Sequence, residues 1–200
     1  MSKKSYSAGL VSQGFWFNEM KKYIELVNDG KSDQEIKQSS EENNIFAAVS
    51  ASRANEIFNA SRRRVKVLGS EMQTLFPKLN IDNQKLVALI AVLLLNDLFL
   101  EFMIEVFQLK IVKGGLQLSP TDYKSFFAEK QRTNGTVAGW KPYTYSRLSS
   151  AYKNYLLESG LIRENGFEDT ITPKVLDVRL REWLKSINRL DIEKAITGGF

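Results

Sequence analysis

The chain contains no cysteine and no histidine among its 200 residues. Without cysteine there is no disulfide framework, no thiol nucleophile and no cysteine-ligated zinc site. Without histidine there is no Ser-His-Asp triad, no imidazole metal ligand and no side chain that titrates near neutral pH in the usual way. Catalysis would need carboxylates with a metal, or a lysine or tyrosine. The composition therefore leaves an enzyme few options, and we expect no cofactor and no metal.

Long apolar runs are also scarce. The best membrane candidate covers residues 86–107, but its uninterrupted apolar part is only residues 86–95. Asn96 and Asp97 lie near its middle, and an aspartate at the centre of a bilayer costs about 2.5–3.5 kcal/mol. We expect two successive helices of a soluble core. The basic start, Lys3-Lys4, is followed by no continuous apolar segment, so we expect no signal peptide.

The charge balance is mildly basic, with 28 Lys and Arg against 23 Asp and Glu. Contents of 43% apolar and 26% charged residues are typical of a globular protein. A chain of this length suffices for one domain or for two small ones that share a core. A polyanionic partner is compatible with the charge only where the cations cluster on one face.

Residues 1–80 are predicted to be an N-terminal helical region, a helix-turn-helix-like bundle that includes a basic helix. Ser32 and Glu35 have the spacing of a capping box, which marks a helix start. Gly69 is a natural helix end, and Pro77 marks a soft boundary. The expected elements are a helix at residues 15–27, a polar helix after Ser32, a third helix from residue 50 to 69, and a short helix broken at Pro77.

Residues 81–200 are predicted to hold an apolar helix pair and a winged-helix-like region with a short β-hairpin. Asn165-Gly166 is typical of a type I′ turn, which would make "GLIR" and "FEDTI" the two strands of a wing. The order of elements is that of a winged helix-turn-helix, and the fold class is mainly α. The expected elements are helices at 82–112, a strand in "LQLS", a helix after Ser119-Pro120, a flexible connection "QRTNGTVAGWKP", a helix from Thr144, the hairpin, and a last helix at 173–188.

The helix from Thr144 has two different faces. Its predicted core face gathers Leu148, Ala151, Tyr152, Tyr155 and Leu156. Its other face is rich in serine rather than in the usual Glu and Lys; arginine and asparagine there can bond guanine and adenine edges. A serine-rich solvent face is the alternative interpretation. The predicted DNA contacts of this region are Arg147, Ser150, Lys153 and Asn154 on the helix, Lys141 before it and Arg163 on the wing.

A second candidate site is the cationic stripe of "NASRRRVKVLG". Successive helical residues are about 100° apart, so Asn55, Asn59, Arg62, Arg63 and Lys66 share one sector. The opposite sector holds Ala54, Ile57, Phe58, Val65 and Leu68, with Arg64 at its margin. We predict phosphate contacts from Arg62, Arg63 and Lys66. The alternative is a solvated face on which Arg64 pairs with a carboxylate.

The remaining cluster is the acidic strip of Asp97, Glu101 and Glu105. Carboxylates spaced by one helical turn can hold a divalent cation, as in a metal-dependent nuclease. The same strip is also the single polar edge of an apolar helix, where acids keep that edge in water. We prefer this second interpretation and expect no metal site.

Three segments of the chain resemble the BrxA family, accessory proteins of the BREX bacteriophage-exclusion systems. These are the run from "YSAGLVSQGFWF" to "EENNIF", the "RRRV" of the third helix, and "SRLSSAYKNYLLESGLI". The resemblance implies a cytoplasmic, mostly helical protein that binds double-stranded DNA, works with other BREX components and has no catalysis of its own. The family fold is similar to helical RNA-binding antitermination factors, so RNA binding is one alternative. A protein-interaction adaptor with basic docking faces is the other.

Overall fold

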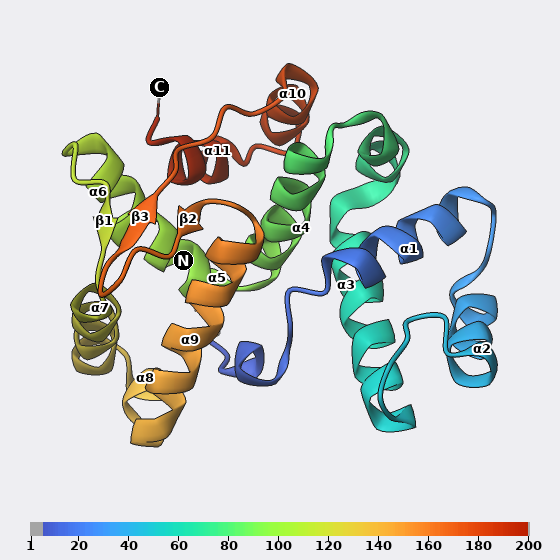
Figure 1. Cartoon of the computed structure of the whole chain (residues 1–200), viewed down its shortest axis with the longest axis horizontal. Coiled ribbons are helices and arrows are strands. Elements are labelled where there is room, and N and C mark those ends of the chain that lie inside the picture. Colours follow the sequence, from blue (N-terminus) through green and yellow to red (C-terminus); the bar gives the residue numbers. More distant parts are fainter. Residues whose placement is uncertain (1–5, 200) are drawn as a thin grey trace. The chain divides into compact units, whose positions relative to one another are not determined.

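The computed structural model describes residues 6–199, which form two compact units (Figure 1). The N-terminal unit spans Gln13–Leu95, and the C-terminal unit combines residues 6–12 with the chain from Asn96 onward. The basic start, Lys3 and Lys4, lies outside the described residues. Each unit is described by itself below.

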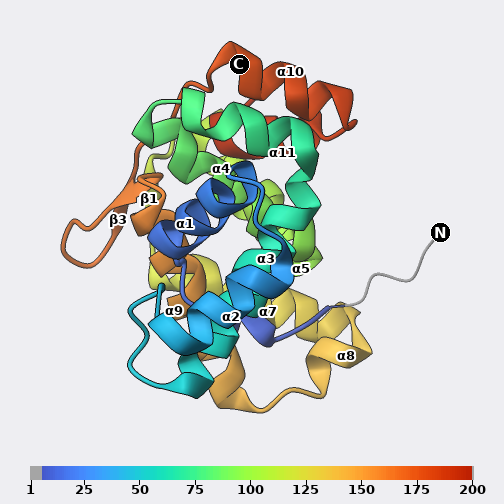
Figure 2. The same ribbon diagram turned by 90° about the vertical axis from the view of Figure 1, so that its right-hand side faces the viewer.

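The N-terminal unit is helical, with α1, α2 and α4 packed against α3. In Figure 2, α1 and α2 lie in front of α3. The predicted capping box is confirmed, because the Ser32 side chain accepts from the Glu35 N–H and the Glu35 carboxylate accepts from the Ser32 N–H. The elements are α1 (Phe17–Asn28), α2 (Asp33–Asn43), α3 (Ala51–Leu75), the 3₁₀ helix η2 (Phe76–Lys78) and α4 (Ile81–Leu95).

Helix α3 begins and breaks where the sequence predicts. The Ser50 side chain accepts a hydrogen bond from the Arg53 N–H, which caps the first turn. Gly69 has φ 72° and ψ 168°, a backbone conformation that interrupts the helix and favours glycine. Helical geometry resumes after this kink and continues as far as Leu75, so the predicted short helix is present as the part of α3 that follows Gly69.

The C-terminal unit is built from helices around a small sheet. Its three strands are antiparallel in the order β1-β3-β2, with Gln117 opposite Thr170 and Ile162 opposite Ile171. The elements are η1 (Gly9–Ser12), α5 (Asp97–Phe102), the π-helix η3 (Met103–Gln108), α6 (Leu109–Val112), β1 (Gln117–Leu118), α7 (Pro120–Thr133), α8 (Gly135–Ala138), α9 (Pro142–Glu158), β2 (Ile162–Arg163), β3 (Asp169–Ile171), α10 (Val178–Ser186) and α11 (Leu190–Thr197).

The predicted core face of α9 is confirmed at four of its five residues, whereas Ala151 is only half-buried. Leu148, Tyr152, Tyr155 and Leu156 are each no more than 1% exposed. The Tyr152 ring stacks on Phe99 of α5 with ring centroids 4.2 Å apart, and the ring of Phe127 on α7 lies 5.7 Å from it. Aromatic contacts of this kind add to the area that burial removes from water. They fix which face of α9 is turned away from the core.

Three expectations for the C-terminal unit are wrong. The connection after α7 is not free of structure, because Asn134 accepts from the N–H groups of Thr136 and Val137 and caps α8. The hairpin turn is not type I′, because that turn needs positive φ at both central residues and only Gly166 has it. The buried pair Ile162 and Ile171 sets the register and leaves residues 164–168 as a longer loop, visible as a projection in Figure 2.

The third correction concerns the last helix, which is expected at residues 173–188. Helix α10 instead begins after Asp177, whose carboxylate accepts from the Arg179 N–H. It ends before Asn188, which has a left-handed backbone (φ 56°). A further helix, α11, follows and buries Ile192 and Ile196 against η3.

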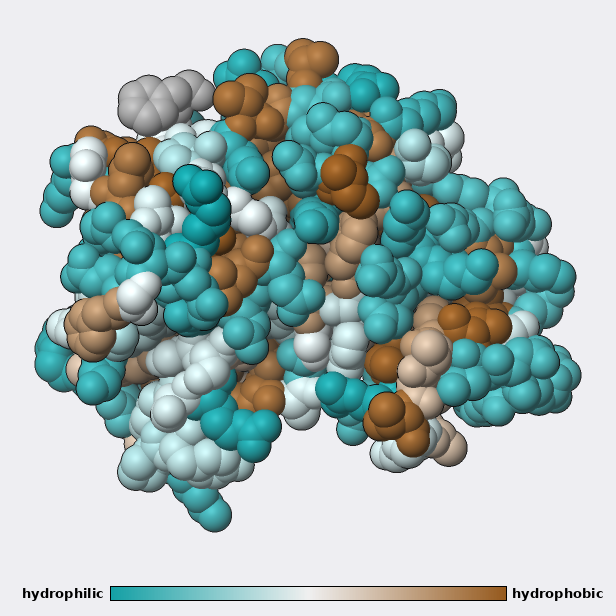
Figure 3. Space-filling view, viewed as in Figure 1, coloured by the Kyte–Doolittle hydropathy of each residue, from teal (hydrophilic) through white to brown (hydrophobic). Residues whose placement is uncertain are grey.

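The apolar stretch after residue 81 forms two helices, as predicted, and they are separated at Asn96. The Asn96 side chain accepts from the Phe99 N–H and starts α5. Among the described residues no single helix is long and apolar enough to cross a membrane; only the bent pair of Ile81–Leu95 and Asp97–Val112 passes such a test. On the face shown in Figure 3, hydrophobic residues form separate patches among hydrophilic ones.

Candidate nucleic-acid interface

The predicted stripe lies on the exposed face of α3. Arg62, Arg63 and Lys66 are exposed, and the opposite sector of the helix is buried as predicted. Arg63 and Lys66 form no ion pair with any residue that the structure describes. Their cationic groups are therefore open to an external anion.

Arg62 differs from its two neighbours because it is already paired. Its Nε lies 2.5 Å from Asp33 Oδ2 at the start of α2, and the Tyr23 hydroxyl donates to the other oxygen of the same carboxylate. The hydrogen bond from Tyr23, together with Arg62, holds the pKa of Asp33 below its ordinary value. Burial and the neighbouring Asp33 raise the pKa of Tyr23. Asp33 thus stays ionised and offsets the charge of Arg62.

Arg64 is buried and is held by backbone carbonyl groups of the segment before α1. It is 2% exposed and donates to the backbone carbonyls of Phe15 and Gly14, the latter at 2.9 Å. Its guanidinium also lies 5.7 Å from the centre of the Trp16 ring, and that of Arg53 lies 4.8 Å from it. Arg64 therefore holds the segment before α1 against α3.

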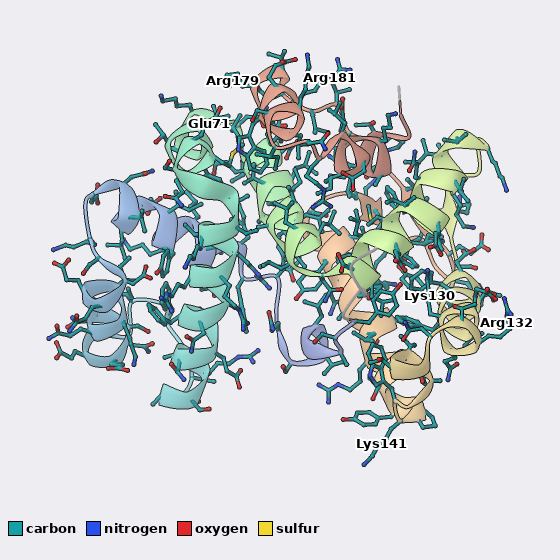
Figure 4. The ribbon with its side chains drawn as sticks, turned by 180° about the vertical axis from the view of Figure 1, so that it is seen from behind. Glu71, Lys130, Arg132, Lys141, Arg179 and Arg181 are labelled. Atoms are coloured by element: carbon teal, nitrogen blue, oxygen red, sulfur yellow. The ribbon has the colours of Figure 1, made fainter. Side chains whose placement is uncertain are left out.

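Helix α9 begins at Pro142, a favoured first helical residue that follows Lys141. Lys141 is exposed and points away from the ribbon at this end of the helix (Figure 4). Near the other end, Asn154 is exposed as well. Neither side chain has a hydrogen bond or ion pair within the part of the chain that the structure describes.

The predicted contact residues in the middle of α9 are all engaged. The Arg147 guanidinium donates to the Val11 carbonyl of η1 at 3.1 Å. The Ser150 hydroxyl donates to the Ser146 carbonyl at 3.1 Å. Lys153 Nζ lies 3.0 Å from Asp169 on β3 and 3.3 Å from Glu164 in the hairpin loop. The hydrogen bond to Asp169 is the main cause that raises the pKa of Lys153.

The hairpin contributes Arg163 from β2. Its side chain is exposed and unpaired among the described residues, and its backbone lies opposite Thr170. Phe167, in the loop between the strands, is 78% exposed. An aromatic ring so fully in water is unusual and was not among the predicted site residues.

A groove of about 470 Å³ lies between α7, α9 and the hairpin. It brings the predicted residues Ser150 and Lys153 together with side chains that the helical projection of α9 does not reveal, because they come from other elements. Its lining consists of Pro120, Tyr123, Lys124, Phe127, Gln131, Pro142, Tyr145, Ser146, Ser149, Ser150, Lys153, Phe167 and Asp169. The serine face of α9 is therefore one wall of a concavity.

Two of the three carboxylates in the acidic strip pair with one lysine. Lys130 Nζ lies 2.7 Å from Glu101 and 2.6 Å from Glu105, and the Tyr6 hydroxyl donates to Glu101 at 2.7 Å. Burial is the largest single influence on the pKa of Lys130 and lowers it, but the hydrogen bonds and charges of both glutamates together raise the pKa above its ordinary value. Among residues 6–199 no three acidic side chains are placed to hold a metal ion. The strip joins α5 and η3 to α7.

Comparison with solved structures defines the class of fold. The chain matches a crystal structure of an uncharacterized protein from Magnetospirillum magneticum with a TM-score of 0.79 over 98% of this chain and 100% of that one, at 14% sequence identity. Both are mainly helical proteins of one fold. A family model for BrxA matches residues 4–188, and the chain belongs to the BrxA family. A relative from Bacillus cereus (strain H3081.97), "BREX protein BrxA", is 29% identical over 187 residues, 94% of each chain.

Proposed function

We propose that this protein is a cytoplasmic, non-catalytic component of a BREX phage-defence system that binds double-stranded DNA. Its membership of the BrxA family and the name of the Bacillus cereus relative, "BREX protein BrxA", support the role in defence. DNA binding is supported by the exposed cations of α3 and of the region around α9. Phosphate contacts dominate the affinity of most DNA-binding proteins, and lysine and arginine supply them.

The observation that carries the proposal is the arrangement of elements around α9. Helices α5 to α6, strand β1, helix α7, helix α9 and the β2–β3 hairpin come in the chain order of a winged helix-turn-helix, with the short helix α8 inserted between α7 and α9 and the sheet order β1-β3-β2. In such domains the third helix enters a groove of DNA and the hairpin lies beside it. We assign these roles to α9 and the hairpin.

Whether each cation is already paired inside the protein suggests which residues contact phosphates and which contact bases. Arg63, Lys66, Lys141 and Arg163 are unpaired among the described residues and are the proposed phosphate contacts. Asn154 is the proposed base contact, since an asparagine amide can bond adenine at two atoms. Arg62, Arg147, Ser150 and Lys153 are secondary candidates, because each must first leave or share a partner inside the protein.

The test is a salt-dependent binding series on duplex DNA, single-stranded DNA and RNA of the same sequence. Each phosphate contact contributes about −0.9 to the slope of log affinity against log salt, so the four unpaired cations together predict about −3.6 on duplex DNA. Lys141→Ala should make the slope shallower by about 0.9. A flat salt dependence would contradict the phosphate contacts. Tighter binding to RNA than to duplex DNA would show that RNA, not double-stranded DNA, is the ligand.

A role as an interaction adaptor is the second candidate, and one surface favours it. Leu109, Val112 and Leu116, at α6 and before β1, are 45%, 55% and 40% exposed. Exposed apolar side chains close together in the chain are typical of protein contacts. A variant with Arg62, Arg63 and Lys66 changed to glutamate separates the two roles. Loss of DNA binding with intact co-purification of BREX partners supports DNA binding; the reverse result supports the adaptor.

A further inference from the structure

The groove between α7, α9 and the hairpin has the properties of a ligand site. Its volume of about 470 Å³ falls in the range of about 300–1,000 Å³ that is typical of small-molecule pockets. The rings of Tyr123, Phe127 and Tyr145 line it, and the first two are buried. Such pockets combine apolar walls with a few converging polar groups. The polar groups here are unusually well defined.

One lining residue, Tyr123, carries a hydroxyl without a partner among the described residues. Tyr123 is 4% exposed, and its hydroxyl forms no hydrogen bond within residues 6–199. Burial, together with Asp169 and Asp122, raises the pKa of Tyr123, so the hydroxyl keeps its proton and is a donor. A buried hydroxyl without a partner costs free energy, and a ligand atom that accepts a hydrogen bond from it would recover that cost.

Acceptors face the same groove. The hydroxyls of Ser149 and Ser150 donate to backbone carbonyls at 2.9 and 3.1 Å, which leaves their oxygens free to accept. Asp169 is 5% exposed, and Lys153 contacts only its Oδ1 among the described residues. The groove thus offers acceptors to a ligand that carries N–H groups.

One cation on the wall has no internal anion. Lys124 on α7 is exposed and forms no ion pair with any described residue, unlike Lys153, which holds Asp169 and Glu164. An anion attached to the ligand would be placed near Lys124. A flat heteroaromatic ring with amino groups and a linked phosphate meets all of these requirements.

We propose that this groove binds a nucleotide whose base carries an exocyclic amino group, with the base between α7 and α9 and the phosphate at Lys124. Aspartate and serine accept from base amino groups, and aromatic walls suit a base removed from its stack. The nucleotide comes either from a bound DNA strand or from solution. The strand source rests on the proposed DNA binding, whereas the free source does not.

The experiment uses the full chain and two fluorescent probes, 2-aminopurine deoxyriboside monophosphate and a duplex with one 2-aminopurine at successive positions. Ser149→Phe fills the groove, and Ser125→Phe, on the exposed surface of α7 outside the lining, is the matched control. We expect Ser149→Phe to weaken the probe response at least tenfold and Ser125→Phe to leave it unchanged. Circular dichroism and thermal unfolding establish that both variants are folded.

A second variant keeps the test decisive if Ser149→Phe does not fold. Lys124→Ala should bring the affinity for the monophosphate down to that for the nucleoside, because only the phosphate contact is removed. Thymidine monophosphate, which has no exocyclic amino group, should compete poorly with deoxyguanosine and deoxycytidine monophosphates. Equal competition by all of them would contradict the assignment of Asp169 and the serines.

The outcomes separate this proposal from the proposed function. A Ser149-dependent response of the free probe identifies a solution nucleotide, and such a response of the duplex probe identifies a base of the strand. No response from either probe, while anisotropy shows duplex binding, overturns the groove proposal and leaves DNA binding intact. A response of the free probe without duplex binding supports the groove proposal and overturns the proposed DNA binding.

Discussion

Asp33→Asn should convert a paired arginine into a DNA contact. In the native protein the Asp33 carboxylate lies 2.5 Å from Arg62 Nε and offsets its charge at the centre of the cationic stripe. The substitution removes the negative charge and keeps nearly the same shape. Because the amide oxygen of asparagine still accepts from the Tyr23 hydroxyl, the local packing should survive. Arg62 would then be available to a phosphate, as Arg63 and Lys66 already are.

The expected magnitude follows from counterion release. One added phosphate contact steepens the slope of log affinity against log salt by about 0.9. Between about 50 and 200 mM salt, this increment enlarges the loss of affinity by about 3.5-fold. The cost to folding is small, because both side chains of the pair are about half exposed, and exposed pairs contribute about 0.2–1 kcal/mol.

The assay is fluorescence anisotropy of a labelled duplex at five salt concentrations, with urea unfolding as a check on stability. Asp177→Asn is a matched control, because Asp177, like Asp33, lies at the start of a helix and pairs with an arginine, Arg179, at 2.7 Å. Arg179 lies outside the proposed interface, so its release should leave the slope unchanged. An unchanged or shallower slope for Asp33→Asn would refute the role of the stripe, and a steeper slope for both variants would show that any added charge has the same effect.

Three further outcomes concern stability and are measured by urea unfolding. Lys130→Met leaves the buried Glu101 without its counter-ion and should destabilise the protein by about 3 kcal/mol; a loss below about 1 kcal/mol would contradict the ion pair. Tyr152→Phe removes a buried hydroxyl that has no partner among the described residues and should be neutral or stabilise by about 1 kcal/mol; a clear loss would reveal a partner. The pKa of Asp122 is lowered by the Ser119 backbone and by Lys110, against an opposing effect of burial. Its contribution is therefore present above the unfolded pKa of 3.8 and is lost as pH falls further, so Asp122→Asn should flatten the pH dependence below pH 4.

Local signals in the sequence account for much of the fold. The capping box of Ser32, the proline after Ser119 and the break at Gly69 act within a few residues of themselves, and each is confirmed. Helix α11 was missed because its stability comes from burying Ile192 and Ile196 on the π-helix η3. Packing between segments that are far apart in the sequence cannot be predicted from the residues of one segment alone. The hairpin turn was misjudged for the same reason, since buried side chains outweigh the preference of an Asn-Gly pair.

The exposure of the candidate site residues follows from local sequence, whereas their pairing depends on residues far away in the chain. Helical projection correctly predicts which side of α3 and α9 is exposed, because that depends on spacing alone. It does not predict which cations are neutralised. The partner of Arg62 is 29 residues away in the chain, that of Lys153 is 16 away and that of Arg147 is 136 away. Lys124 was missed because it faces the groove from α7 and belongs to no cationic run.

These pairings change how α9 would meet DNA. A helix that reads base edges with its middle needs unengaged side chains there, yet Arg147, Ser150 and Lys153 are all engaged inside the protein. The unengaged groups are Lys141 and Asn154 towards its two ends. We infer that α9 approaches DNA through its ends and the neighbouring hairpin, while its serine face belongs to the groove. Ser150→Ala should then leave duplex affinity within about twofold, whereas Lys141→Ala and Asn154→Ala should each lower it by more. A larger effect of Ser150→Ala than of the other two variants would show that the middle of α9 contacts the bases.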